Sequence, residues 1–313
     1  MNEKIATREA YGKALVELGR ENPDVVVLDA DLAKSTKTIS FKKHFPERFF
    51  DMGVAEQNMI GTAAGLAAAG KIAFASSFAV FAAGRAFEQV RNSVAYPALN
   101  VKIGASHAGI TVGEDGGSHQ SVEDIALMRV LPNMTVFVPA DAVETSRVVR
   151  AAAEIDGPVY IRLGRMAVPV LHGDDFQFVA GKAVTMRQGR DVTVVACGIM
   201  VPAALEAAAA LAGEGVEAGV LNVHTVKPLD VEALVAAAKA TGAVVTAEEH
   251  SIIGGLGSAV AEALGEHYPV PLKRVGIRDV FGESGAPGEL LVKYGLTPRD
   301  IVAAVKEVLG RKR

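Results

Sequence analysis

Short apolar runs that alternate with helical patterns restrict the fold of this 313-residue sequence more than any other feature. The run VVVLDAD, residues 25–31, stays apolar until it reaches two carboxylates, as a strand buried on both faces of a parallel sheet would. Similar runs recur at residues 71–76, 100–106, 134–140 and 157–164, and a segment with helical periodicity separates each run from the next. This order predicts a doubly wound α/β domain.

The alternation pauses at residues 171–183, LHGDDFQFVAGKA, a polar, glycine-containing stretch that we interpret as an inter-domain linker. A second series follows, with strands at VTVVACG, EAGVLNV, AVVTAEE and PLKRVGI and helices that start near Val201, Val231, Gly254 and Pro298. The sequence therefore predicts two doubly wound, mainly parallel-sheet domains, at residues 1–172 and 180–313.

Capping signals predict several helix ends. Thr7 caps the first helix and Gly19 ends it. Ser121 opens a capping box, SVED, and Asp141 caps the helix after it. Thr297 caps the last helix, with proline at its first position.

Composition excludes several classes of protein. Half of the residues are apolar and the net charge is −4, so no basic excess indicates binding to nucleic acid or to a membrane surface. The single cysteine cannot form an internal disulfide, and no Cys/His metal spacing occurs. The N-terminus has no apolar signal core, and no apolar run reaches the ~18 residues of a membrane span. We therefore expect a cytoplasmic protein.

Polar side chains gather where the predicted strands of the first domain end. Ligands bind beyond the carboxyl ends of the strands in sheets of this type, so we expect chemistry in the first domain. The residues at these ends are Asp31, Ser35, His107, Arg162 and Arg165.

The stretch SHAGITVGEDGGSHQSVED, residues 106–124, is the most informative. Two histidines, two acids and four glycines lie between His107 and Gln120. Glycines let the backbone approach a ligand closely, and His107, Asp115 and His119 are available as donors or proton carriers. A surface Ω-loop with a satisfied histidine is the alternative.

Three motifs in order resemble the pyrimidine-binding domain of transketolases. They are DADLAKS (residues 29–35), DMGVAEQNMIGTAAGLAAAG (residues 51–70) and GITVGEDGGSHQSVEDIALMRVLPNMTVFVPAD (residues 109–141). The second half of the chain resembles the transketolase C-terminal domain. The GDG…N motif, which binds the metal and the diphosphate of thiamine diphosphate in this family, does not occur. The chain therefore resembles the C-terminal subunit of a split transketolase.

This resemblance implies a cofactor site on the chain. Glu56 would share a proton with a ring nitrogen of the aminopyrimidine, and the Ala/Gly-rich wall after it would desolvate that carboxylate. Phe78 and Phe81 would line the pyrimidine pocket, with Phe81 as the stacking partner, and Asp31 would lie near the thiazolium. A third aromatic residue usual in the family is replaced by Gly84.

The resemblance also implies a sugar site and a reaction. Asp115 would recognise the α-hydroxyl of the substrate, and His119 would carry protons near the reacting carbons. The reaction would move a two-carbon ketol unit from a ketose phosphate to an aldose phosphate. The residues implied for the phosphate are Arg8, Ser35, His107 and Arg165, with Arg162 as a nearby competitor for the last position.

The missing GDG…N motif implies a second chain. An N-terminal transketolase subunit would bind the diphosphate and hold Mg²⁺ or Ca²⁺, so we expect no metal ligands on this chain. Family symmetry implies two copies of each chain, a heterotetramer.

Alternative functions remain at this point. The β-subunit of a 2-oxoacid dehydrogenase has a similar size, similar domains and a matching Glu, but it lacks the GEDGGSHQ loop with His107 ahead of it. Deoxyxylulose-phosphate synthase shares the AEQ motif around Glu56. In this motif Ala55 and Gln57 occupy positions where transketolases usually have Arg and His. A non-catalytic assembly subunit is the third alternative. Residues 248–250, EEH, could hold a metal, but a loop or subunit contact is the preferred interpretation.

Overall fold

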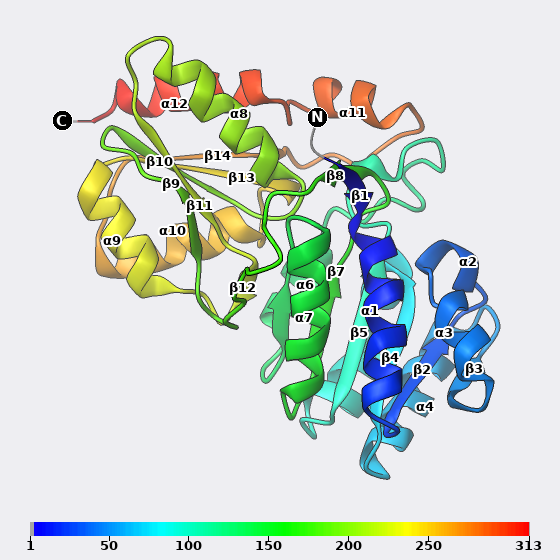
Figure 1. Cartoon of the computed structure of the whole chain (residues 1–313). Coiled ribbons are helices and arrows are strands. Elements are labelled where there is room, and N and C mark those ends of the chain that lie inside the picture. Colours follow the sequence, from blue (N-terminus) through cyan, green and yellow to red (C-terminus); the bar gives the residue numbers. More distant parts are fainter. Residues whose placement is uncertain (1–2, 313) are drawn as a thin grey trace.

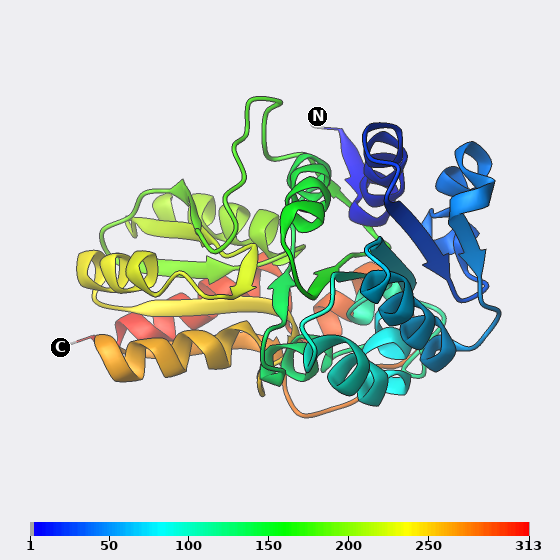
Figure 2. The same cartoon turned by 90° about the horizontal axis from the view of Figure 1, so that it is seen from below.

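A computed structural model describes residues 3–312 of the chain. Two open sheets lie side by side, each with helices on both faces (Figures 1 and 2). A small third sheet pairs β1 (Lys4–Ala6) with β8 (Ala167–Pro169) in antiparallel register. The predicted fold class, two mainly parallel α/β domains, is confirmed.

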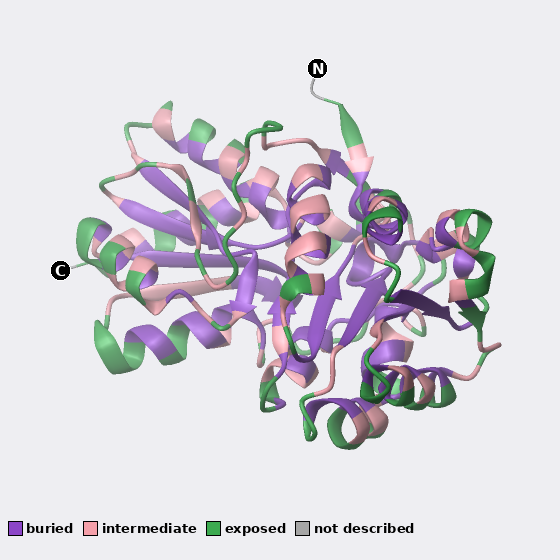
Figure 3. Ribbon diagram, turned by 60° about the horizontal axis from the view of Figure 1, so that its bottom comes forward, coloured by how far each residue is buried: buried purple, intermediate pink, exposed green. Residues whose placement is uncertain are grey.

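The first sheet has seven strands, and every neighbouring pair is parallel except the first. Its central strands are buried along almost their whole length (Figure 3), as a sheet covered on both faces requires. In sheet order the strands are β12 (Thr225–Lys227), β6 (Thr135–Phe137), β7 (Val159–Arg162), β5 (Val101–Ser106), β4 (Ile72–Phe78), β2 (Val25–Asp29) and β3 (Phe49–Asp51).

Alternate residues of this sheet face two different layers of helices. Phe74 packs with the layer of α1, whereas Ala73 and Ala75 pack with the layer of α4. The first layer contains α1 (Thr7–Glu21), α3 (Ile39–His44) and α7 (Ala142–Glu154). The second contains α4 (Glu56–Ala68), η2 (Val80–Arg85), α5 (Phe87–Gln89), η3 (Val90–Ala95) and α6 (Asp124–Val130). The short helices α2 (Ala33–Thr36), η1 (Pro46–Arg48) and η4 (Ile110–Val112) lie in the connections.

The second sheet has five strands and one antiparallel edge pair, β11 with β9. Its order is β14 (Leu272–Ile277), β13 (Val244–Ser251), β10 (Val192–Ala196), β11 (Ala218–Asn222) and β9 (Val184–Arg187). The helices on one face are α8 (Met200–Ala212), α11 (Pro287–Lys293) and α12 (Pro298–Leu309), and those on the other are α9 (Val231–Thr241) and α10 (Leu256–His267).

The two domains share one apolar core. A single cluster of buried side chains runs from Met59 and Ile60 of α4 to Leu256 and Val260 of α10. In addition, β12 follows β11 in sequence but leaves the second sheet and pairs with β6 of the first. The proposed domain bounds, 1–172 and 180–313, therefore assign to the second domain a strand that completes the first sheet.

Two of the predicted helix-end signals are present and three are wrong. Asp141 accepts a hydrogen bond from the Glu144 N–H, and Thr297 forms a capping box with Asp300. Thr7 lies inside α1, where its hydroxyl accepts from Gly164 N–H at 2.8 Å, and α1 continues past Gly19 to Glu21. Ser121 is paired with Ala108 in an isolated bridge, so α6 begins at Asp124 without the predicted box.

Candidate active site

The predicted site residues lie around the carboxyl ends of β2, β4, β5 and β7. β4 and β5 pair Phe78 with Ser106, which places the residues that follow these strands next to each other. Arg8 lies in the first turn of α1 and Glu56 in the first turn of α4. The topology therefore brings six segments of the chain to one edge of the first sheet.

Glu56 is the buried acid of the site. Its side chain is 1% exposed at the N-terminal end of α4, where the helix dipole favours a carboxylate. Arg85 of η2 donates from Nη1 to Glu56 Oε2 at 2.8 Å and is itself about half exposed. The guanidinium also lies 4.5 Å from the centre of the Phe81 ring. The sequence interpretation missed Arg85, although it directly follows the unusual Gly84.

An aromatic wall continues from Phe81. The rings of Phe78 and Phe81 are stacked, with centroids 5.9 Å apart and an angle of 11° between the planes. His107 stacks on Phe78 at 3.8 Å, and His119 lies edge-on to Phe81 at 5.3 Å. Phe78 is buried and Phe81 is only partly buried, so Phe81 is the more accessible of the two residues. At Gly84 an added Cβ would meet no heavy atom within 4 Å among the described residues, so the place of the missing aromatic is open.

A group of cations surrounds His107. Arg8 Nη1 donates to the carbonyl oxygen of Ser35 at 3.0 Å and lies 3.0 Å from His107 Nε2. Burial first, and then the charges of Arg8 and Arg165, lower the pKa of His107 to about 3. His107 is therefore neutral at physiological pH, with Nε2 accepting from Arg8 and Nδ1 donating to Ser106 Oγ at 2.9 Å. Lys37, which the sequence interpretation missed, adds to the same positive field.

Arg165 joins this group to the Gly-rich loop. Its Nη1 donates to the carbonyl oxygen of Val112 and lies 3.5 Å from Asp115 Oδ2. Arg162, the competing candidate, is 6% exposed and is engaged elsewhere: Nε donates to Asp124 at 2.9 Å. Asp115 is exposed, and the His119 Nδ1 lies 3.0 Å from Ser118 Oγ. The geometry thus favours Arg165 over Arg162 as the cation that faces this site.

Asp29, the last residue of β2, accepts hydrogen bonds from the loop that follows this strand. This buried carboxylate accepts from Leu32 N–H at 2.7 Å and from the hydroxyls of Thr36 and Thr38 at 2.7 and 2.8 Å. Burial raises the pKa of Asp29 to about 6 despite these hydrogen bonds. Asp31, with φ of 61°, is exposed at the rim, and its N–H donates to Asp51 Oδ1 at 3.1 Å. Asp31 therefore shares the sheet edge but not the direct contacts of the other predicted residues.

The EEH segment belongs to β13 and is buried between the domains. Glu248 accepts from the N–H groups of Leu256 and Gly257 at 2.6 and 2.7 Å, and Glu249 accepts from Thr111 N–H at 2.7 Å. The preferred interpretation as a loop or subunit contact is wrong, because all three side chains are inside the protein. Among residues 3–312, no group of three or more His, Cys, Asp or Glu side chains is placed to hold a metal ion.

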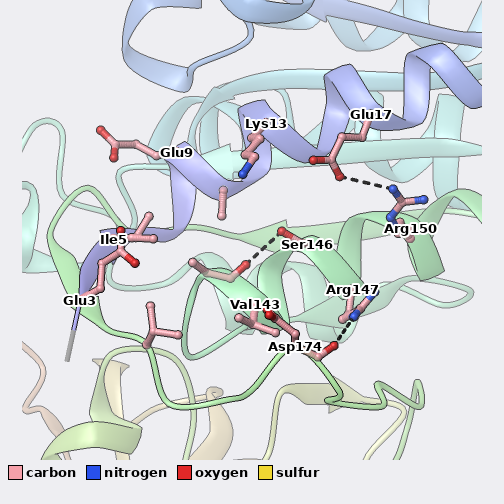
Figure 4. A pocket seen from close by; sticks show the side chains of 13 residues that line it. Glu3, Ile5, Glu9, Lys13, Glu17, Val143, Ser146, Arg147, Arg150 and Asp174 are labelled. Atoms are coloured by element: carbon pink, nitrogen blue, oxygen red, sulfur yellow. Dashed lines mark hydrogen bonds and ion pairs between the residues drawn. The ribbon is translucent and has the colours of Figure 1, made fainter.

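A separate hollow of about 610 Å³ lies between α1 and α7 (Figure 4). Two arginines in its wall already have partners: Glu17 Oε2 lies 3.3 Å from Arg150 Nη2, and Arg147 donates to the backbone carbonyl oxygen of Asp174 at 2.7 Å. As far as the described residues form its lining, none of the predicted site residues contributes to it. In the same described part of the chain, no helix combines the length and hydropathy needed to cross a membrane.

Comparisons with known proteins agree on one family. The family model described as "Transketolase, pyrimidine binding domain" matches residues 3–170, and that described as "Transketolase, C-terminal domain" matches residues 181–301. A Methanocaldococcus jannaschii protein, provisionally named a transketolase C-terminal section, is 51% identical, with 97% of this chain and 96% of that protein covered. The "6-deoxy-6-sulfo-D-fructose transketolase subunit SqwH" of a Clostridium species is also 51% identical, with 97% of this chain and 95% of that subunit covered.

One solved structure is similar over its whole length. It is named "Split gene transketolase, inactive beta4 tetramer", is 64% identical and superposes with a TM-score of 0.93, covering 99% of this chain and all of that one. Together with the two family models, which cover most of the sequence, these matches extend over both domains. The chain belongs to the transketolase family and consists of its pyrimidine-binding and C-terminal domains.

Proposed function

We propose that this chain is the C-terminal subunit of a two-chain transketolase. With an N-terminal partner it transfers a two-carbon ketol unit from a ketose phosphate to an aldose phosphate, using thiamine diphosphate. The observation that carries the proposal is the placement of a buried carboxylate, an aromatic ring face and a group of cations along one sheet edge.

The residues present suit the pyrimidine half of the cofactor. Glu56 offers a carboxylate oxygen to a ring nitrogen in a place shielded from water, and Phe81 offers a ring face beside it. When bound, thiamine diphosphate supplies the centre that stabilises the acyl carbanion equivalent. Because the sequence has no GDG…N motif, the proposal assigns the diphosphate and its Mg²⁺ or Ca²⁺ to the partner chain.

The remaining residues suit a sugar with an anionic end. Arg8 and Arg165 offer charge-assisted donors for a phosphate, and neutral His107 lies between them and the aromatic wall. In this proposal Asp115, which lies beside Arg165, accepts from a sugar hydroxyl, and His119, which lies beside Phe81, holds or moves a proton. One relative is named for a sulfonated sugar, so a sulfonate in place of the phosphate is a second candidate for the same cations.

The proposal includes assembly and location. Two copies of each chain would form the active enzyme, because the family cofactor site lies between chains. We expect this enzyme in the cytoplasm. The name of the solved relative describes a tetramer of one chain type as inactive, which supports the need for a second chain type.

Mixing the chain with its partner tests the proposal. The mixture contains thiamine diphosphate, Mg²⁺, xylulose 5-phosphate and ribose 5-phosphate, and a parallel reaction replaces the donor with 6-deoxy-6-sulfo-D-fructose. We expect ketol transfer from the mixture and none from either chain alone. Release of CO₂ from pyruvate would instead support the dehydrogenase or synthase alternatives. Cofactor binding without turnover of any donor would support the assembly subunit.

A further inference from the structure

A segment of the second domain lies against the Gly-rich loop of the first. The segment comprises residues 278–286 between β14 and α11, and the loop comprises residues 113–120 (Figure 1). Ser284 Oγ donates to the carbonyl oxygen of Glu114 at 2.6 Å, and Gln120 Nε2 donates to that of Glu283 at 2.9 Å. The loop that contains Asp115 and His119 is therefore bonded directly to the second domain.

Glycines on both sides make this contact possible. A Cβ on Gly282 would lie 1.8 Å from Gln120 Oε1, and a Cβ on Gly117 would lie 2.6 Å from the carbonyl oxygen of Gly282. An added side chain would therefore clash with the Gln120 side chain at Gly282 and with the backbone of Gly282 at Gly117. On the neighbouring turn, a Cβ on Gly113 would meet Pro287 of α11 at 3.1 Å.

Gln120, at the end of the loop, bonds both to residues at and just before the start of the loop and to the second domain. Its side chain is buried, and Nε2 shares its hydrogens among the carbonyl oxygens of Ile110 at 3.2 Å, Gly113 at 3.1 Å and Glu283 at 2.9 Å. This conformation of the loop is favoured because another one would take the buried Nε2 donor away from these three carbonyl oxygens.

A second contact between the domains holds residues 109–111, just before this loop. Glu249 of β13 accepts from Thr111 N–H at 2.7 Å, and a Cβ on Gly109 would lie 2.1 Å from its carboxyl carbon. Within the first domain, Arg165 donates to the carbonyl oxygen of Val112, just before the loop, and lies 3.5 Å from Asp115 in the loop.

We propose that Gln120 and residues 282–284 of the second domain are positioning residues for the sugar site. They set the place of Asp115 and His119 relative to the aromatic wall, while Glu56 and Phe81 lie outside this contact. This inference rests on the proposed function, and it gives the second domain a role in substrate recognition.

Two variants in the assembled two-chain enzyme test this role. Gly282→Ala places a methyl group against Gln120, and Ser284→Ala removes one hydrogen bond without adding atoms. Gly288→Ala is the matched control, since its Cβ would meet no described heavy atom within 4 Å. We expect kcat/KM for the donor sugar to fall by about 10- to 100-fold in Gly282→Ala and about fivefold in Ser284→Ala, mainly through KM.

Two further measurements separate positioning from general disruption. The affinity for thiamine diphosphate, followed by fluorescence quenching, should stay within about twofold of the parent, because Glu56 and Phe81 are not disturbed. Amide hydrogen exchange in residues 113–120 should accelerate in both variants but not in Gly288→Ala.

Parent-like exchange and parent-like KM in both variants would overturn the inference. A parent mixture that neither binds the cofactor nor transfers a ketol unit would refute the proposed function instead. In that case the exchange data alone would still decide whether the second domain holds the loop.

Discussion

Arg85 donates a hydrogen bond to Glu56 at 2.8 Å while its guanidinium lies 4.5 Å from the centre of the Phe81 ring. One side chain thus contacts the buried carboxylate and the ring face that the proposed cofactor site requires. The contact balances the charge of a carboxylate that is 1% exposed, and it links η2 to the first turn of α4.

Arg85→Ala should therefore destabilise the isolated chain. The substitution leaves Glu56 buried without its cation, but Arg85 is about half exposed and water screens the pair. We expect a loss of about 1 kcal/mol in the free energy of unfolding, measured by urea denaturation. Arg91→Ala, an exposed arginine on η3, is the control. Equal stability of the two variants would show that the pair contributes nothing measurable.

Glu56→Gln should stop turnover while leaving the fold intact. Glutamine keeps the shape of the side chain but cannot share a proton with the cofactor ring. In the assembled enzyme we expect kcat to fall by about 10²–10⁴-fold. Glu88→Gln, an exposed position on α5, should behave as the parent. A near-normal rate for Glu56→Gln would remove this residue from the proposed mechanism.

Arg165→Ala should discriminate between phosphorylated and unphosphorylated donors. Losing a charge-assisted donor should raise KM for the phosphorylated ketose about tenfold or more and affect the unphosphorylated sugar less. The same steady-state comparison with Arg190→Ala, an exposed arginine of the second domain, should show no change. Equal KM changes for both sugars would indicate that Arg165 acts only by holding the Gly-rich loop.

The lowered pKa of His107 should reduce the free energy of unfolding in acid. Its pKa is about 3 in the folded chain, against an ordinary value of 6.5, because of burial and the neighbouring cations. Above pH 6.5 both states are neutral and the difference vanishes. Below it the unfolded chain takes up a proton that the folded one refuses, so the loss reaches about 2 kcal/mol at pH 5.

His107→Asn should remove this part of the pH dependence. Asparagine tolerates the left-handed backbone at this position, where φ is 56°. Urea denaturation at pH 7 and pH 5 gives the stability change for parent and variant, and other titrating groups cancel in the comparison. If both chains lose the same free energy between these pH values, His107 is not the group responsible.

Replacing Gly104 and Gly65 by alanine should change the free energy of unfolding in opposite directions. A Cβ on Gly104 of β5 would lie 2.1 Å from the hydroxyl of Tyr11, which is buried and bonded to Ser76 at 2.7 Å. Gly104→Ala should cost about 1–3 kcal/mol of stability. Gly65 of α4 has no described heavy atom within 4 Å of an added Cβ, so Gly65→Ala should stabilise the isolated chain by about 0.5–1 kcal/mol. Thermal and urea unfolding compare the two.

Short sequence patterns correctly predicted the strands and helix caps that depend only on residues a few positions apart in the chain. The run at Val25–Asp29 forms a buried strand, and Asp141 and Thr297 cap helices, because each feature needs only residues within a few positions. The box at Ser121 was wrong because its backbone pairs with Ala108, a contact across the loop that no local pattern reveals. Likewise, β12 is three residues long, too short to show an alternating hydrophobic pattern, so its sequence could not predict that it joins the first sheet.

The sequence by itself determined the α/β fold class, the transketolase resemblance and the candidate residues from Arg8 to Arg165. Only the tertiary structure decided how they are supported: the Arg85–Glu56 pair, the cations around His107 and the attachment of the Gly-rich loop to residues 282–284. The physical reason is that strand periodicity and helix caps act over a few residues. Arg85 and Glu56 are 29 residues apart and meet only when the first domain folds, and Ser284 and Glu114 are 170 residues apart and meet only when the two domains pack together.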